Sequence, residues 1–314
     1  MTPPSRTSPP PTEPSSDGLT HEQLTFWDEN GYLLIPNALS PSTVSSLLRE
    51  THTLLTTFPL ETHPMTKFST GQEGNAHVGD EYFLTSGDKM RFFFEEDAFT
   101  AAGALAKPKE RAVNKIGHYL HELSPPFRSA SLTAQNAAVA RSLGFRDPRC
   151  LQSMIICKQP EIGGAVPPHQ DSTFLFTEPP SAVGFWYALE DATVENGCLS
   201  FAAGSHKRAA VGQRFVRAED GSGTTFVANE GSRFPAGGFE QSEAPGEGEE
   251  EYTLGEVKAG TLVLIHGNLL HKSEKNSSQK GRIIYTFHVI EGENEYDGRN
   301  WLQPPKEGFS KLYT

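Results

Sequence analysis

The stretch TLVLIHGNLLHKSEKNSSQKGRIIYTFHVI at residues 261–290 decides the fold class of this chain. Apolar and β-branched runs alternate in it with turns built on Gly and Asn, a pattern that predicts short strands. The same pattern begins after Pro148, with strands expected at 150–158, 172–178, 183–190, 197–202, 223–227, 251–257, 261–266, 269–274 and 282–290. So many short strands in succession predict an all-β core arranged as a jelly-roll barrel.

Helices are expected ahead of this β-rich part and flank its core. Thr20 caps a first helix that ends at Gly31, and a strand follows at 32–35. The pair Ser40-Pro41, a cap followed by a first-turn proline, opens a second, amphipathic helix. Further helices are expected at 109–123 and 129–143. These helices are predicted to cover one sheet of the jelly roll.

The chain is expected to form one domain with a tail. Residues 1–18 are dominated by Pro, Ser and Thr, which predicts a disordered segment. Residues 19–314 are long enough for one sizeable core and show no internal repeat. A Gly-rich connection at about 217–251 is interpreted either as a lid over a pocket or as a solvated loop. It carries a cluster of glutamates at Glu240, Glu243, Glu247, Glu249, Glu250 and Glu251.

Composition narrows the class of partner. The formal net charge of −12 disfavours nucleic acid and anionic membrane surfaces, so a small-molecule substrate is expected, while the oligomeric state is not indicated. No run approaches the roughly 18 apolar residues of a membrane span, and no secretory or peroxisomal signal is visible, which predicts a cytoplasmic protein. Cys150, Cys157 and Cys198 show no metal-type spacing and are expected to be reduced, buried thiols.

His169-Gln170-Asp171 is the main candidate for a metal clip. In an extended strand, residues two apart project to one side, so His169 and Asp171 face together while Gln170 points away. The clip follows Pro167-Pro168 and precedes an expected strand, which places it at a strand edge facing the barrel mouth. Two histidines and one carboxylate suit ferrous oxygenases, which keep positions open for a co-substrate and dioxygen. The alternative is a polar turn that merely faces water.

The third ligand has four candidates, His206, His266, His271 and His288. His271 is favoured because it shares a strand face with Ser273 beside the expected cavity. His266 ends a buried run and is interpreted as a hydrogen-bonded structural histidine. His206 is interpreted as the organiser of a turn, with a supporting or substrate role left open, and His288 as core packing.

Arg282 is expected to bind a carboxylate. On its predicted strand it shares a face with Thr286 and His288, and a hairpin through Asn276–Gly281 brings it beside His271. When 2-oxoglutarate chelates iron through its keto-acid end, its distal carboxylate needs a partner, because burying it unpaired would cost several kcal/mol. A guanidinium can bind this carboxylate with two parallel hydrogen bonds. The alternative is a surface arginine. Ligand set and arginine together predict Fe(II), 2-oxoglutarate and dioxygen, with ascorbate as a supporting reductant.

Ordered segments between residues 20 and 314 carry a family resemblance. They are Tyr82-Phe83-Leu84-Thr85-Ser86-Gly87-Asp88-Lys89, Arg91-Phe92-Phe93-Phe94-Glu95, Asn114-Lys115-Ile116-Gly117-His118, Gln152-Ser153-Met154, Lys158-Gln159-Pro160, His169-Gln170-Asp171, Glu190-Asp191-Ala192-Thr193, Glu195-Asn196-Gly197-Cys198, Leu264-Ile265-His266-Gly267, His271-Lys272-Ser273, Tyr285-Thr286-Phe287-His288 and Asn300-Trp301-Leu302-Gln303-Pro304. With these segments the chain resembles the phytanoyl-CoA dioxygenase family. Two departures are Ala203, where the family usually has proline before Gly-Ser-His, and a longer acidic insertion.

The resemblance implies a cupin-like double-stranded β-helix with iron held by His169, Asp171 and His271. It also implies a set of residues that contact the co-substrate, namely Lys115, Met154, Gln170, Trp186, Ser273 and Arg282. From the residues alone, Lys115 would lie on the face of a helix, Met154 would pack in the core, and Trp186 would lie in the core on a strand.

These observations predict an Fe(II)- and 2-oxoglutarate-dependent hydroxylase that acts on an aliphatic C–H of a small organic or lipid-like substrate. Its catalytic residues would be His169, Asp171, His271 and Arg282. Asp171 argues against halogenation, because a halide would need the coordination position that the carboxylate fills. Fatty acyl-CoA is the substrate that the family suggests, although the negative net charge disfavours its phosphates. The alternatives are an iron- and 2-oxoglutarate-binding sensor, a non-catalytic jelly roll, or a zinc-dependent hydrolase.

Overall fold

The structure is a computed structural model that describes residues 18–67, 79–236 and 250–313. The predicted tail lies outside these residues except for Gly18, and so do most of the clustered glutamates. The helices are α1 (His21–Asn30), α2 (Pro41–Thr57), α3 (Glu81–Leu84), α4 (Leu120–Leu123), α5 (Pro125–Ser131), α6 (Ala134–Ser142) and α7 (Asp171–Phe174), with short 3-10 turns η1 (Glu96–Ala98), η2 (Lys109–Arg111) and η3 (Ser205–Lys207).

The strands pair mainly into two antiparallel sheets. They are β1 (Tyr32–Ile35), β2 (Met90–Phe94), β3 (Val113–His118), β4 (Pro148–Lys158), β5 (Val166–His169), β6 (Val183–Ala188), β7 (Leu199–Phe201), β8 (Gln213–Arg217), β9 (Thr224–Ala228), β10 (Thr253–Gly255), β11 (Leu262–His266), β12 (His271–Ser273), β13 (Arg282–Glu291) and β14 (Ser310–Lys311). The large sheet has the order β1-β11-β6-β13-β4-β3-β2, with β14 on β4, and the small sheet has the order β10-β7-β12-β5. Strands β8 and β9 pair with each other.

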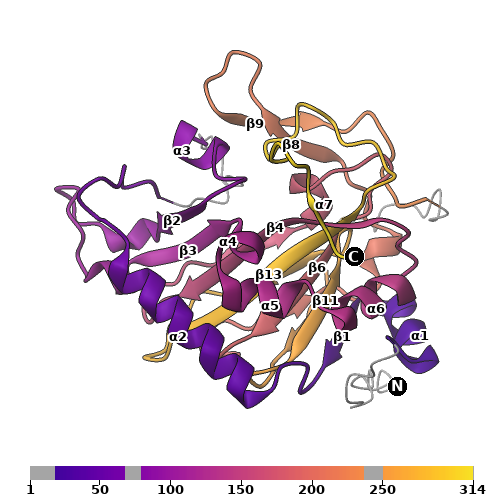
Figure 1. The fold of residues 1–314 in the computed structure, drawn as a ribbon, viewed down its shortest axis with the longest axis horizontal. Coiled ribbons are helices and arrows are strands. Elements are labelled where there is room, and N and C mark those ends of the chain that lie inside the picture. The colour runs from indigo at the N-terminus through magenta and orange to yellow at the C-terminus, as the bar shows by residue number, and fades with distance from the viewer. Residues whose placement is uncertain (1–17, 68–78, 237–249, 314) are drawn as a thin grey trace.

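Helices cover one face of the large sheet, as the sequence predicted. Figure 1 shows α2, α4 and α5 in front of β13 and β6, while β8 and β9 lie at the top beside α7. Alternate residues of β13 account for the two faces. Tyr285 and Phe287 join the large apolar cluster that the helices complete, whereas Ile284 joins the cluster between the two sheets. Among the described residues, no helix is long and apolar enough to cross a bilayer.

Helix α1 begins and ends, and helix α2 begins, where their capping residues predict. Thr20 accepts a hydrogen bond from the backbone of Gln23, whose side chain accepts one from the backbone of Thr20 in return. Gly31 closes α1 in the left-handed conformation at φ 77°. Ser40 caps α2 ahead of the first-turn Pro41. The three cysteines are buried and unpaired, as expected.

The expected helix at 109–123 is wrong. The segment forms η2, then β3, and only then the short helix α4. Strand β3 is fixed by antiparallel pairing with β2 on one side and β4 on the other, and such long-range pairing overrides local helix propensity. The expected helix at 129–143 is also divided, because α5 ends at Ser131 and α6 begins at Ala134.

The expected strand at 172–178 is also wrong. Asp171 opens the one-turn helix α7, and the strand lies ahead of it as β5, Val166–His169. Local patterning missed β5 because Pro167 and Pro168 demote a run as a strand candidate. Strand β5 lies at the edge of the small sheet and pairs only with β12, so it tolerates both prolines.

Candidate active site

Strand register brings the two candidate histidine ligands together. His169 ends β5 and His271 begins β12, and the two residues are direct partners in the antiparallel pairing of these strands. Their ring centroids are 4.2 Å apart. Residues far apart in the chain therefore present two imidazoles side by side at one edge of the small sheet.

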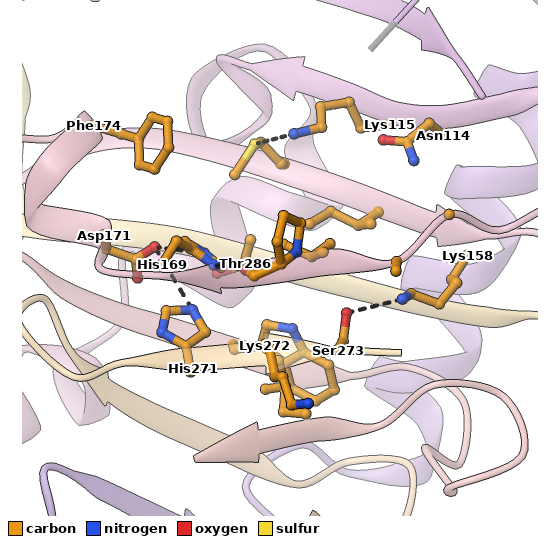
Figure 2. A pocket seen from close by; sticks show the side chains of 18 of the residues that line it. Asn114, Lys115, Lys158, His169, Asp171, Phe174, His271, Lys272, Ser273 and Thr286 are labelled. Carbon is orange, nitrogen blue, oxygen red and sulfur yellow. Dashed lines mark hydrogen bonds and ion pairs between the residues drawn. The ribbon is translucent and has the colours of Figure 1, made fainter. Parts of the chain in front are cut away.

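Asp171 completes the cluster from the start of α7. Gln170, between His169 and Asp171, has an extended backbone with φ −116° and ψ 129°. The side chains of His169 and Asp171 therefore project to one side, although strand β5 ends at His169. Oδ1 of Asp171 lies 3.7 Å from Nε2 of His169 and 3.9 Å from Nε2 of His271. One donor atom from each of the three residues lies within 4.8 Å of the others. Figure 2 shows the three side chains converging.

Backbone carbonyls fix the tautomer of both histidines. Nδ1 of His169 lies 3.0 Å from the Pro167 carbonyl, and Nδ1 of His271 lies 3.0 Å from the Leu269 carbonyl. Because a carbonyl can only accept, each Nδ1 carries the proton and each Nε2 keeps its lone pair. Burial lowers the pKa of His169 to about 4, which keeps its ring neutral. Neutral imidazole is the form that binds a metal ion.

His288 holds the second oxygen of the aspartate. Nε2 of Gln152 lies 3.4 Å from Nδ1 of His288 and can only donate, so the proton of His288 sits on Nε2. That Nε2 lies 3.3 Å from Oδ2 of Asp171. Burial alone would raise the pKa of Asp171, but His271 and His288 hold it well below its usual range. The interpretation of His288 as core packing is therefore wrong.

The cluster opens on a cavity of about 610 Å³. Besides the three candidate ligands, five of the predicted co-substrate residues line it, namely Lys115, Met154, Trp186, Ser273 and Arg282. The sixth, Gln170, is not among the lining residues. Its amide donates to the carbonyls of Ala209 and Asn268, each at 2.8 Å, which agrees with the expectation from strand geometry that Gln170 points away.

Arg282 is only 2% exposed, so its alternative interpretation as a surface arginine is wrong. Its Nη1 donates to the carbonyl of Gly197, and its guanidinium lies 5.6 Å from the centre of the Trp186 ring. Its Nε is sealed from solvent and has no hydrogen-bond partner among the described residues. A buried cation with an unused donor beside a cavity fits an anionic ligand.

Lys158 stands beside Arg282, although it was not among the residues expected to contact the co-substrate. Its Nζ donates to Oγ of Ser273 at 2.9 Å and to the carbonyl of Glu274. Burial and the neighbouring Arg282 lower its pKa to about 7. The signal was present, because Lys158 lies an even number of residues beyond Met154 on β4 and therefore shares its face.

Lys115 lies across the cavity on β3, as Figure 2 shows. Its Nζ is 3.8 Å from the sulfur of Met154. Burial lowers the pKa of Lys115 to about 7, against the opposing effect of Glu95. Lys115 reaches the cavity because its segment is a strand and not the expected helix.

The two remaining histidine candidates lie apart from this cavity. His206 and His266 pack against each other with ring centroids 4.9 Å apart, and neither is a lining residue. Nε2 of His206 lies 3.0 Å from the Asp28 carbonyl, and Nδ1 of His266 accepts from the backbone of Asn268. Both therefore act as structural histidines, as the sequence indicated.

Residues 27–284 match the family model described as Phytanoyl-CoA dioxygenase (PhyH). The chain belongs to the phytanoyl-CoA dioxygenase family. Phytanoyl-CoA dioxygenase domain-containing protein 1 of Bos taurus is 42% identical over 303 residues, which cover 94% of this chain and 99% of the relative. A phytanoyl-CoA dioxygenase of Arabidopsis thaliana is 40% identical over 92% of this chain and 95% of the relative.

Solved structures show the fold of this family member. The non-heme alpha-ketoglutarate-dependent carbocyclase SnoK from nogalamycin biosynthesis superposes with a TM-score of 0.58 at 21% identity, over 91% of this chain and 89% of that one. EctD from S. alaskensis superposes with a TM-score of 0.56 at 18% identity, over 98% and 95%. With the two antiparallel sheets and flanking helices, these likenesses confirm the predicted cupin-like double-stranded β-helix.

Proposed function

We propose that this family member is an Fe(II)- and 2-oxoglutarate-dependent oxygenase that hydroxylates an aliphatic C–H of a small organic or lipid-like molecule. One observation carries the proposal. The His169, Asp171 and His271 donor atoms lie within 4.8 Å of one another in a cavity that a buried arginine, Arg282, also lines. Two imidazoles and one carboxylate form the facial ligand set of non-heme iron oxygenases.

The residues fit the metal. Nε2 of His169, Nε2 of His271 and Oδ1 of Asp171 would hold it, while His288 keeps the carboxylate oriented through its other oxygen. Bound iron would supply the activation of dioxygen that inserts one oxygen atom into the C–H bond, while the other converts 2-oxoglutarate to succinate and carbon dioxide. The chain's part is to hold three ligands on one side and leave the cavity side free for reactants.

The residues also fit the co-substrate. Arg282 and Lys158 place two cations at one end of the cavity, and Ser273 supplies a hydroxyl between them and the ligands. A distal carboxylate bound there would meet the guanidinium of Arg282 and the ammonium of Lys158, both of which line the cavity. Met154 and Trp186 would flank its carbon chain.

Solved structures of the same fold contain ligands of this kind. The SnoN epimerase structure contains Fe3+, alpha-ketoglutarate and nogalamycin RO, and an EctD structure contains 2-oxoglutarate and 5-hydroxyectoine. At 18% identity each, these likenesses support the fold alone. The assignment for this chain therefore depends on its own ligand cluster and buried arginine.

The test is succinate release by the full chain with Fe(II), 2-oxoglutarate, ascorbate and dioxygen, with metal content measured in parallel under anaerobic conditions. We expect iron-dependent succinate formation that increases when a substrate is oxidised. Asp171→Ala should bind less metal and form no succinate. Bound iron and 2-oxoglutarate without succinate would instead identify a sensor. Full zinc occupancy without iron-dependent activity would identify a hydrolase, and either result refutes the proposal.

A further inference from the structure

Aromatic rings line the cavity on the side away from the two cations. Phe174 of α7 lies 6.1 Å from the ring of the candidate ligand His169, and Phe215 of β8 lies 5.4 Å from Phe174. Trp301 follows at 6.4 Å from Phe215, and Phe83 of α3 stacks on Trp301 at 4.4 Å. We call Phe83, Phe174, Phe215 and Trp301 the aromatic wall. Figure 2 shows Phe174 at the Asp171 end of the cavity, with Lys158 and Ser273 at the other.

One polar side chain, His118, is packed into this wall. Its ring lies 5.7 Å from Phe83 and 5.2 Å from Trp301, and it lines the cavity. Its Nδ1 lies 2.7 Å from Oγ of Ser86. That hydroxyl donates its only proton to the carbonyl of Phe83, so it must accept from His118. The proton of the imidazole is therefore on Nδ1, and Nε2 carries a lone pair.

Nε2 of His118 has no hydrogen-bond partner among the described residues. The ring is only 2% exposed and lines the cavity, so this unpaired acceptor is buried at the cavity wall. Burial and the nearby Lys115 hold the pKa of His118 well below its usual range, which keeps the ring neutral. His118 thus offers one hydrogen-bond acceptor in apolar surroundings.

The arginines behind the wall are already engaged. Arg217 donates to the carbonyls of Trp301 and Leu84, each at 2.9 Å. Arg214 pairs with Asp297 at 2.8 Å and donates to Asn300 at 3.0 Å. Within the described part of the chain, the wall therefore presents rings and an acceptor, and these guanidinium groups are turned to other partners.

We propose that the prime substrate is an uncharged, largely apolar molecule whose hydroxyl group donates a hydrogen bond to Nε2 of His118 while its hydrocarbon body packs on the aromatic wall. The proposal rests on the function proposed above and names the substrate class of that site. A cavity of about 610 Å³ lies in the range that buries a drug-sized ligand. An acyl-CoA would bring several phosphates to a surface of rings and an acceptor, where burial lowers the pKa of the nearby Lys115 to about 7.

The experiment compares matched alcohols and methyl ethers by quenching of intrinsic tryptophan fluorescence. The full chain is loaded with Fe(II) and 2-oxoglutarate without dioxygen, so that binding proceeds without turnover. The probes are farnesol and 2-naphthaleneethanol, each beside its methyl ether, with farnesyl diphosphate as the anionic probe. We expect each alcohol to bind about two- to tenfold more tightly than its ether, the discrimination that one neutral hydrogen bond provides. Farnesyl diphosphate should bind more weakly than farnesol.

Variants separate the hydrogen bond from packing. His118→Phe keeps an aromatic ring but removes the acceptor, so alcohol and ether should bind alike. His118→Gln keeps an acceptor and should restore part of the preference. Phe174→Ala should weaken alcohol and ether by the same factor, because it removes wall surface alone. If neither alcohol binds more tightly than its ether, if the diphosphate binds best, or if His118→Phe keeps the preference, the proposal is overturned.

Succinate release without any prime substrate distinguishes this proposal from the one it rests on. Basal succinate with no alcohol preference would overturn the role of His118 and leave the oxygenase in place. An alcohol preference without any succinate, under any probe, would overturn the oxygenase and retain the binding site.

Discussion

Nε2 of His288 lies 3.3 Å from Oδ2 of Asp171, and this contact joins the long central strand β13 to the one-turn helix α7. The contact leaves Oδ1 of Asp171 facing His169 and His271. Hydrogen bonds of this kind to a ligating group set its direction and its basicity. The position of the carboxylate is therefore fixed by the large sheet as well as by its own short helix.

His288→Phe should weaken metal binding by about 10- to 100-fold, because Asp171 loses the donor that orients it. Calorimetric titration of the metal-free protein with Co(II) measures this directly. His288→Gln, which keeps an N–H donor, should recover part of the affinity. The exposed His52 provides a control, since His52→Phe should leave the affinity unchanged. Equal Co(II) affinity in wild type and His288→Phe would contradict the role assigned to His288.

Arg282→Met should raise the KM for 2-oxoglutarate by roughly 10- to 100-fold, the value of a hydrogen bond to a charged group. The kcat should change much less, because the guanidinium lies at the end of the cavity opposite the aromatic wall. Succinate formation at varied 2-oxoglutarate gives both constants. Arg128, whose side chain is 54% exposed, is the matched control. A variant with normal KM and low kcat would show that Arg282 does not hold the co-substrate.

Lys158 should make 2-oxoglutarate binding depend on pH. Its pKa of about 7 means that the ammonium is charged below that pH and loses its charge as pH rises. Bound dicarboxylate favours the charged form, so the KM should be lowest near pH 6 and rise by roughly tenfold toward pH 9. Lys158→Met should flatten the profile, apart from the share due to Lys115, whose pKa is also about 7. A profile that is unchanged in this variant would exclude Lys158 from binding.

Gly31→Ala should destabilise the fold by about 1–2 kcal/mol or more, because Gly31 has φ 77° and a Cβ there would lie 2.4 Å from Nδ1 of His206. Gly212→Ala is the control, since a Cβ at Gly212 meets nothing within 4 Å. Its effect should stay within about 0.5 kcal/mol. Urea denaturation of both variants measures the difference in the free energy of unfolding. Equal midpoints would show that His206 moves aside without loss of stability.

Features decided by neighbours in the chain were predicted correctly. The caps at Thr20 and Ser40 and the stop at Gly31 need only local geometry, and the structure has all three. The clip of His169 and Asp171 also survived the wrong strand at 172–178. Its geometry depends on the extended conformation of Gln170 alone.

Some features decided by distant pairing were not predicted. Lys115 and His118 share β3, which exists because β2 and β4 lie on either side of it. The alternation of side chains along β13 correctly predicted the face that carries His288. The contact between His288 and Asp171 was missed because α7, which supplies Asp171, was expected as a strand. The cytoplasmic location stays a prediction, and so does the role of the acidic connection, whose clustered glutamates lie mostly outside the described residues.

The aromatic wall comes mostly from segments that hold neither the candidate metal ligands nor the cationic end. Phe83 lies in α3, Phe215 in β8 and Trp301 beyond β13, while Asp171 and Phe174 meet within α7. Figure 1 shows α3 and β8 in the upper part of the molecule, above α2 and α5. Exchanging these peripheral segments would change which compounds are oxidised and would leave the metal ligands in place. The scaffold is therefore suitable for laboratory evolution of selective oxidation catalysts.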